Sequence, residues 1–328
     1  MNTPISPASF DFAARTDDAG HDLALVQLGR RLQADAYHFV TVTPLSHERN
    51  NARPGNRRAR NLRDVFGWSR PFEADLLSKT ELDALASRGV ISAEGGLWRS
   101  TVRWSSLQDL LFVHSAFPTV GHDAVFFGPD TYRYAQAIEQ HLSHCVHPIR
   151  TAVDIGCGSG MGAILIGRAR REAQVSAVDI NPTALRFTAV NAALAEVTNV
   201  SAWHSDILTG VGGDFDLIVA NPPYMQDTLQ RAYRHGGERM GSELSVRIAE
   251  AAVARLTLGG TLLLYTGAPC VDGVDLFLAH ALPVVDRPEF AWSYREVDPD
   301  VFGEELDTET YANAERIAAV VLTVTRVA

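Results

Sequence analysis

From about residue 150 to the C-terminus, apolar segments of strand length alternate with amphipathic stretches of helix length. This alternation is the pattern of a parallel sheet covered by helices on both faces, so it restricts this part of the chain to an α/β fold. We expect seven strands, at 151–155, 174–180, 200–203, 216–220, 261–266, 289–294 and 318–325. Helices are expected at 161–171, 182–197, 242–256 and 275–281, and a glycine turn at 258–260. The prediction is a doubly wound, Rossmann-like sheet.

The first 125 residues are less periodic. We expect helices at 23–32 and 81–87, a polar stretch at 46–63 and a small hairpin across 89–104. A helix followed by a hairpin is the local pattern of winged-helix units. A further helix, at 131–142, leads into the sheet. We therefore predict two domains: a smaller, mainly helical N-terminal domain at 1–125 that recognises the substrate, and a sheet domain at 126–328.

The charge balance excludes a protein uniformly coated with basic residues for nucleic-acid binding, because 29 Lys and Arg against 39 Asp and Glu give a net charge of −10. The three cysteines are far apart, so neither a disulfide framework nor a paired zinc site is expected. His141, His144, Cys145 and His147 lack a second ligand cluster, and we expect no metal. The N-terminus carries no signal-peptide pattern and the apolar runs are short, which predicts a cytoplasmic protein without membrane contact.

A glycine-rich turn lies between the first expected strand and the helix that follows it, in the segment AVDIGCGSG. Gly156, Gly158 and Gly160 allow a tight turn and a close approach of the backbone to a ligand. Asp154 precedes the glycines at the strand end, where its carboxylate would accept hydrogen bonds from a ligand's ammonium group. Asp179 ends the second strand, where a carboxylate can bind both hydroxyls of a ribose.

These motifs resemble those of the class I S-adenosylmethionine (SAM) methyltransferases. The segment AVDIGCGSG of this chain matches the first motif of that family, and AVDIN at 177–181 matches the segment with its second-strand acid. The resemblance implies a SAM site that includes Asp179 and Asn181. It also implies an adenine contact at Asp206, in the segment SDI after the third strand. An NAD-binding Rossmann domain is the alternative, but the glycines depart from the regular GxGxxG spacing.

The fourth expected strand is followed directly by Asn221-Pro222-Pro223-Tyr224. Ligands bind at this edge of open α/β sheets. Two prolines restrict the backbone, so the Asn221 side chain and the Pro222 carbonyl are held in place as two acceptors for an NH2 group. Tyr224 offers a flat face to a planar substrate. The alternative is that NPPY only ends a strand and opens a loop.

The NPPY segment resembles that of SAM enzymes that methylate nitrogen conjugated to a π-system: glutamine amides, adenine N6 or guanine N2. Upstream, VFFGPDT at 125–131 is similar to the RPDTE segment of protein-(glutamine-N5) methyltransferases, with Gly128 in place of the arginine and Tyr132 in place of the glutamate. This similarity implies that Thr131 belongs to the cofactor site. We therefore expect a SAM-dependent N-methyltransferase acting on a protein glutamine; a guanine-N2 or adenine-N6 nucleic-acid enzyme and a non-catalytic SAM-fold binding module are the alternatives.

Two further segments carry open alternatives. The stretch 47–70 has seven arginines and two carboxylates, a local charge of +5. Its Arg49–Arg63 part is either a flexible nucleic-acid docking arm or a loop whose charges are solvated or paired with the acidic body. The glycine-rich segment 233–241 after NPPY is either a flap over the acceptor or an ordinary surface loop. The sequence does not determine the oligomeric state.

Overall fold

The computed structural model describes residues 16–226 and 233–328. Its main sheet has the strand order β11-β12-β9-β8-β5-β6-β7, with the short strand β10 paired to β9 beside this path. Neighbours from β9 to β7 are parallel, whereas β12 is antiparallel to both β9 and β11. The strands are β5 Thr151–Ile155, β6 Gln174–Asp179, β7 Val200–His204, β8 Phe215–Ala220, β9 Leu256–Val271, β10 Val274–Asp275, β11 Phe290–Asp298 and β12 Arg316–Arg326.

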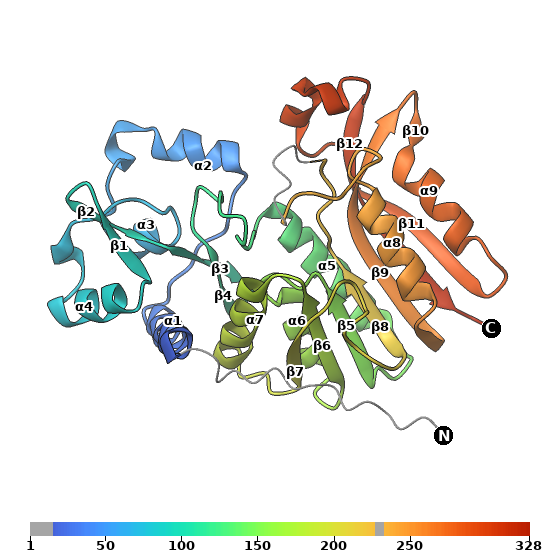
Figure 1. The fold of residues 1–328 in the computed structure, drawn as a ribbon, viewed down its shortest axis with the longest axis horizontal. Helices are drawn as coiled ribbons and strands as arrows, with labels where there is room; N and C mark the ends of the chain where they lie inside the picture. The colour runs from blue at the N-terminus through green and yellow to red at the C-terminus, as the bar shows by residue number, and fades with distance from the viewer. Residues whose placement is uncertain (1–15, 227–232) are drawn as a thin grey trace.

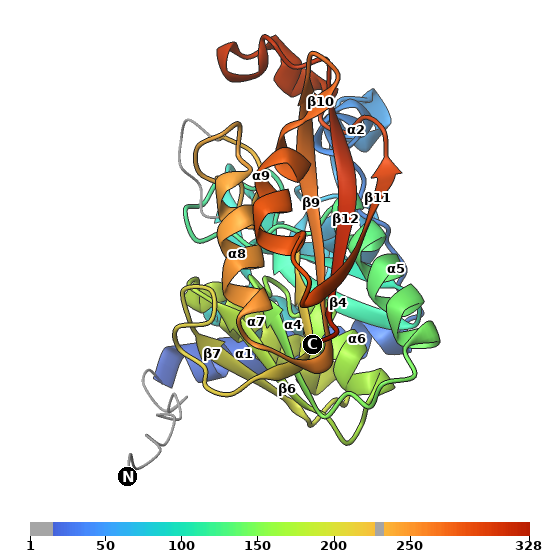
Figure 2. The ribbon, with the colours of Figure 1, turned by 90° about the vertical axis from the view of Figure 1, so that its right-hand side faces the viewer.

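Helices cover both faces of this sheet (Figures 1 and 2). On one face α5, α6 and α7 pack on the strands through Ile138, Ile164 and Leu185, and on the other α8 and α9 do so through Val246 and Phe277. Their bounds are α5 Pro129–His144, α6 Met161–Ala169, α7 Pro182–Leu194, α8 Glu243–Val253 and α9 Leu276–Val285. The doubly wound architecture predicted from the sequence is confirmed, including the seven strands of the main path.

The predicted turn at 258–260 is wrong. Strand β9 runs through these residues, and the left-handed φ of Gly259, +81°, lies where the β8–β9 register shifts. The two glycines therefore form an irregularity inside a strand. Strand β9 also extends beyond the predicted end at 266, because its second half is paired with β12 up to Cys270.

The N-terminal part contains four α-helices and two hairpins within the described residues. The elements are α1 Thr16–Ala34, α2 Pro44–Asn51, α3 Leu62–Phe66, α4 Lys79–Ser87, β1 Ile91–Glu94, β2 Leu97–Ser100, β3 Val102–Leu107 and β4 Leu110–Ser115, with short 3-10 turns at Pro54–Asn56 and Ala74–Leu76. Helix α4 and the β1–β2 hairpin follow the prediction. The predicted strand through residue 104 is instead broken at Thr101, and β3 pairs with β4 in a second hairpin.

The core of the N-terminal part continues into the sheet domain. Trp104 and Phe66 belong to the same buried cluster as Phe187 and Val190 of α7. The boundary at residue 125 stays a prediction, since apolar packing is shared across it. None of the described helices is long and apolar enough to span a membrane.

Candidate active site

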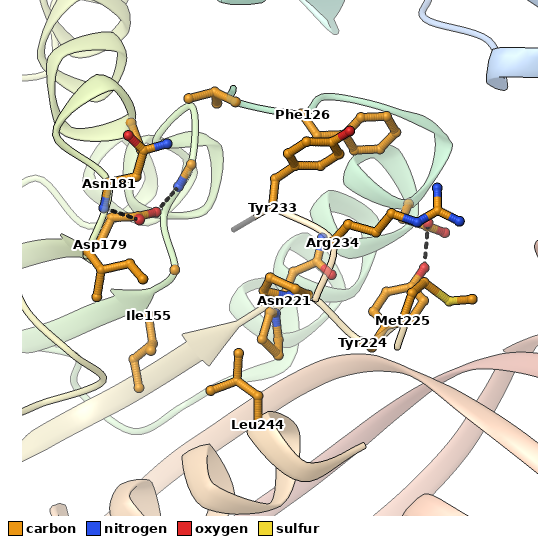
Figure 3. A pocket seen from close by; sticks show the side chains of 18 of the residues that line it. Phe126, Ile155, Asp179, Asn181, Asn221, Tyr224, Met225, Tyr233, Arg234 and Leu244 are labelled. Atoms are coloured by element: carbon orange, nitrogen blue, oxygen red, sulfur yellow. Dashed lines mark hydrogen bonds between the residues drawn. The ribbon is translucent and has the colours of Figure 1, made fainter. Parts of the chain in front are cut away.

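The carboxyl ends of β5, β6 and β8 meet at one pocket (Figure 3). Among its lining residues are nine of the eleven predicted site residues: Thr131, Gly156, Gly158, Asp179, Asn181, Asp206, Asn221, Pro222 and Tyr224. Residues that precede α5 complete the lining, among them Pro44 at the start of α2 and Phe126. Asp154 and Gly160 do not line the pocket.

Asp179 is anchored by two backbone amides. Its carboxylate oxygens accept hydrogen bonds from the N–H of Gly158 at 3.0 Å and of Asn181 at 2.9 Å. Burial raises the pKa of Asp179 above its ordinary value, although these amides act in the opposite direction. The carboxylate is thus fixed at the pocket wall, where it can still accept hydrogen bonds from ligand hydroxyls. The Asn181 side chain is itself engaged, because it caps α7 at Thr183 and donates to the Asp123 carbonyl at 2.8 Å.

Two glycines of the loop, Gly156 and Gly160, serve different purposes. Gly156 has φ +68° and is exposed, and a Cβ built there would meet no atom within 4 Å. A side chain at 156 would therefore project into open space at the pocket. Gly160 caps α6 with φ +77°, and a Cβ there would lie 2.7 Å from the Thr188 side chain. Gly160 allows close packing of the loop on α7, which differs from the predicted ligand contact.

Asp154 lies behind the glycine loop and is only 1% exposed. It accepts hydrogen bonds from the Tyr134 hydroxyl at 3.0 Å and from the Ala163 N–H at 2.9 Å. Burial raises the pKa of Asp154 to about 7. The structure thus gives this carboxylate internal partners instead of a place in the pocket wall, which differs from the predicted contact with a ligand's ammonium group.

The NPPY segment lies opposite the glycine loop. Asn221 and Pro222 line the pocket at the end of β8. Tyr224 is 7% exposed, and its ring packs edge-on against Phe302 and closely over Gly267, where a Cβ would collide with it. Its hydroxyl donates to Asp130 at 2.6 Å. The sequence did not predict this anchorage, although Asp130 belongs to the GPDT segment that the resemblance singled out. Its contact with a planar substrate stays a prediction.

The segment after NPPY folds back on the motif. Met225 donates to the Arg234 carbonyl at 3.1 Å, and Gly236 donates to the Met225 carbonyl at 2.7 Å. Tyr233 stacks on Phe126 with ring centroids 6.0 Å apart, and both line the pocket (Figure 3). Two residues of the predicted flap 233–241, Tyr233 and Arg234, therefore contribute to the wall. Sequence reasoning named Phe126 and Tyr233 only as parts of the segments 125–131 and 233–241, and it assigned neither of them to the site.

The arginine stretch divides into paired and unpaired residues. Arg58 forms an ion pair with Glu73, and Arg60 lies 3.9 Å from Asp64. Arg70 is buried on Asp64 at 2.5 Å. Within 16–226 and 233–328, four exposed arginines of the stretch have no carboxylate within 4.0 Å, namely Arg49, Arg53, Arg57 and Arg63, and Arg63 donates to the His38 carbonyl. Among the described residues, no group of three or more His, Cys, Asp or Glu is placed to hold a metal ion.

Part of the sheet domain is similar to a known family and to several named proteins. Residues 135–268 match the family model of the methyltransferase small domain. A release factor glutamine methyltransferase of Rhodopirellula baltica is 34% identical over 40% of this chain and 49% of its own length. A ribosomal protein uL3 glutamine methyltransferase of Xanthomonas campestris is 35% identical over 52% of this chain and 56% of its own length. A ribosomal RNA small subunit methyltransferase C of Chromohalobacter salexigens is 37% identical over 35% of this chain and 31% of its own length.

The chain therefore spans about half the length of the glutamine methyltransferases that it matches. The matched region begins inside α5 and ends inside β9, so it includes the glycine loop, Asp179 and the NPPY segment. It leaves out α1 to β4 and the closing β11–β12 hairpin. Residues 135–268 are thus similar to the methyltransferase small domain, and the rest of the chain lies outside that match.

Proposed function

We propose that this chain is a SAM-dependent N-methyltransferase whose favoured acceptor is the side-chain amide of a protein glutamine. The observation that carries the proposal is that Asp179 and Asn221 line one pocket. They lie at the carboxyl ends of β6 and β8, the two strands on either side of β5. A fixed carboxylate for hydroxyls and a fixed amide oxygen for an N–H are the two recognition elements that the reaction requires.

The residues present fit the cofactor. Asp179 is anchored so that its free lone pairs face the pocket, and Gly156 leaves open space where a side chain would project. In our proposal Asp179 binds the ribose, the backbone at Gly156 and Gly158 approaches the amino-acid part, and Asp206 lies beside the adenine. When bound, SAM supplies a methyl group on a sulfonium, and its transfer requires no covalent enzyme intermediate.

Asn221 and Pro222 then act on the acceptor. An amide nitrogen is a poor nucleophile because its lone pair is delocalised. Its attack forms the N–CH3 bond as the S–CH3 bond breaks, the leaving group departs as a neutral thioether, and the nitrogen is positive until its extra proton is lost to solvent. The Asn221 side-chain oxygen and the Pro222 carbonyl would accept its N–H groups, and these bonds strengthen as the charge develops. The same two acceptors orient the nitrogen, and the prolines reduce the freedom that is lost on binding.

The names of two relatives, release factor and uL3 glutamine methyltransferase, favour a protein acceptor. The name of a third, a ribosomal RNA methyltransferase, together with the exposed Arg49, Arg53 and Arg57, makes an RNA guanine the second candidate. The two differ in the polymer that carries the methyl group.

The test is to incubate the protein and cell lysate with methyl-labelled SAM, and then to digest separate samples with protease or nuclease. We expect protease-sensitive label that is recovered as methylated glutamine, and about 100- to 1,000-fold slower labelling with the Asn221→Ala variant. Nuclease-sensitive label would transfer the proposal to RNA. Binding of SAM without any incorporation would contradict catalysis and favour a non-catalytic SAM-fold module.

A further inference from the structure

One face of α5 contacts both the NPPY segment and the carboxylate behind the glycine loop. Asp130, in the first turn of α5, is 6% exposed and accepts hydrogen bonds from the hydroxyls of Tyr224 at 2.6 Å and Tyr265 at 2.7 Å. One turn later, Tyr134 donates to Asp154 behind the glycine loop. Residues four apart lie on the same side of a helix, so a single rigid element holds the NPPY tyrosine and the loop carboxylate.

The charge of Asp130 is balanced inside the protein. Arg133 donates to it at 3.1 Å and also donates to Asp298 of β11 at 2.6 Å. A buried carboxylate is costly unless it is hydrogen-bonded and paired, and three donors meet that requirement here. The network joins four elements that are distant in sequence: α5, the NPPY segment, β9 and β11.

The Tyr224 hydroxyl bond lies at the far end of the acceptor motif. Residues 221–224 are fixed at one end by β8, which stops at Ala220, and at the other end by the Tyr224 side chain on Asp130. Two prolines lie between these ends. With both ends held, the backbone between them is restrained, and its residues Asn221 and Pro222 line the pocket.

We propose that Asp130 is a positioning residue, which sets the direction of the Asn221 and Pro222 acceptors by holding the hydroxyl of Tyr224. The catalytic part of this inference rests on the proposed function, while the structural part does not. Asp130 acts through Tyr224 and is given no proton transfer. Misplacement of reacting groups by about 1 Å can cost about 100-fold in rate, so a hydrogen bond of this kind is sufficient to matter.

The test compares Asp130→Asn and Tyr224→Phe with the matched control Tyr294→Phe. Tyr294 also donates to a carboxylate, Asp275 at 2.5 Å, but that pair joins β11 to the start of α9 and does not line the pocket. All three variants lose a tyrosine–carboxylate bond, so a general loss of stability should affect all three.

Two measurements are made on each variant. Hydrogen–deuterium exchange of a peptide covering 221–226 should be faster in Asp130→Asn and Tyr224→Phe, and unchanged in Tyr294→Phe. The initial rate of label transfer from saturating labelled SAM to lysate should fall about 10- to 100-fold in the first two variants only, with unchanged SAM affinity. The double variant Asp130→Asn/Tyr224→Phe should lose no more than either single variant.

Exchange tests the positioning without any methyl transfer. Unchanged exchange over 221–226 in a folded Asp130→Asn protein would overturn the inference, as would additive losses in the double variant. If exchange is faster as expected but the wild type transfers no label, the positioning role stands and the proposed function fails.

Discussion

The Tyr134 hydroxyl donates a hydrogen bond of 3.0 Å to Asp154, a carboxylate that is buried behind the glycine loop and has a pKa of about 7. The unfolded chain would have an ordinary aspartate pKa of 3.8. Between these two values the folded protein holds a proton that the unfolded chain has released. The contribution of Asp154 to stability is therefore fully present below pH 3.8 and is lost as the pH rises to about 7.

The first prediction follows from this direction. The difference between the two pKa values corresponds to about 4 kcal/mol of unfolding free energy. Asp154→Asn cannot titrate, so its unfolding free energy should fall less than that of the wild type between pH 4 and 7. Urea unfolding of both proteins at several pH values measures this. Parallel curves would show that Asp154 has no raised pKa.

A second prediction separates two glycines of one loop. Gly156→Ala and Gly160→Ala both force a left-handed φ on alanine, at about 1–2 kcal/mol each. Only Gly160→Ala also places a Cβ against Thr188, so it should lose more unfolding free energy. Gly156→Ala should fold and lose SAM affinity instead, because its Cβ points into the pocket region. Urea unfolding and calorimetry with SAM distinguish the two; equal losses of stability would contradict the packing role of Gly160.

The third prediction concerns the proposed ribose contact. Asp179→Ala removes charge-assisted hydrogen bonds of ~1.5–3 kcal/mol, so SAM affinity should fall about 10- to 100-fold. Asp214→Ala is the control, since this exposed carboxylate lies before β8 at the opposite edge of the sheet and pairs with Arg255 at 3.6 Å. Calorimetry should give wild-type affinity for the control. Unchanged affinity in folded Asp179→Ala would refute the assignment.

The parts of this fold that the sequence predicts are those with a local signal. Strands β5 to β8 alternate with their helices at regular spacing, and the motifs identify Asp179 and Asn221 from a few consecutive residues. Hairpin β3–β4 was missed because Ser105 and Ser106 interrupt an apolar run. In the structure these hydroxyls are buried with partners: Ser105 with His114 at 2.7 Å, and Ser106 with the Phe39 N–H at 3.2 Å.

The contacts that Asp130 makes with two distant tyrosines could not be predicted from local patterns. Tyr224 and Asp130 are 94 positions apart, and Tyr265 and Asp130 are 135 apart. Each residue taken alone is an ordinary apolar or polar residue in its element. Their relationship exists only once the sheet order places β8 and β9 side by side under α5, and no local pattern carries that information.

A fourth prediction separates chemistry from cofactor binding. Asn221→Ala removes an acceptor whose hydrogen bond strengthens as the substrate nitrogen becomes positive. The activation free energy should therefore rise by ~2.7–4 kcal/mol, so that turnover falls about 100- to 1,000-fold. SAM affinity should change little, because Asp179 and the glycine loop are untouched. Single-turnover label transfer and calorimetry measure the two quantities. Near wild-type turnover on the natural acceptor would refute the role.

The last prediction concerns the choice between protein and RNA acceptors. Arg49, Arg53 and Arg57 are exposed and lack a carboxylate partner among the described residues, whereas Arg58 and Arg60 have partners and Arg63 donates to the His38 carbonyl. Two triple-alanine variants, one of each set, remove the same charge. Because the favoured acceptor is a protein and the net charge is −10, we expect weak RNA binding by the wild type and unchanged label transfer in both variants.

The salt dependence of RNA binding tests this expectation. Each phosphate contact contributes about 0.7–0.9 to the slope of log K against log salt concentration. If these arginines dock RNA, the slope should therefore be smaller by roughly 2–3 in the variant of Arg49, Arg53 and Arg57. The variant of Arg58, Arg60 and Arg63 would lose less, because its first two side chains already neutralise carboxylates. Tight, salt-sensitive binding with this difference, together with nuclease-sensitive label, would make RNA the acceptor.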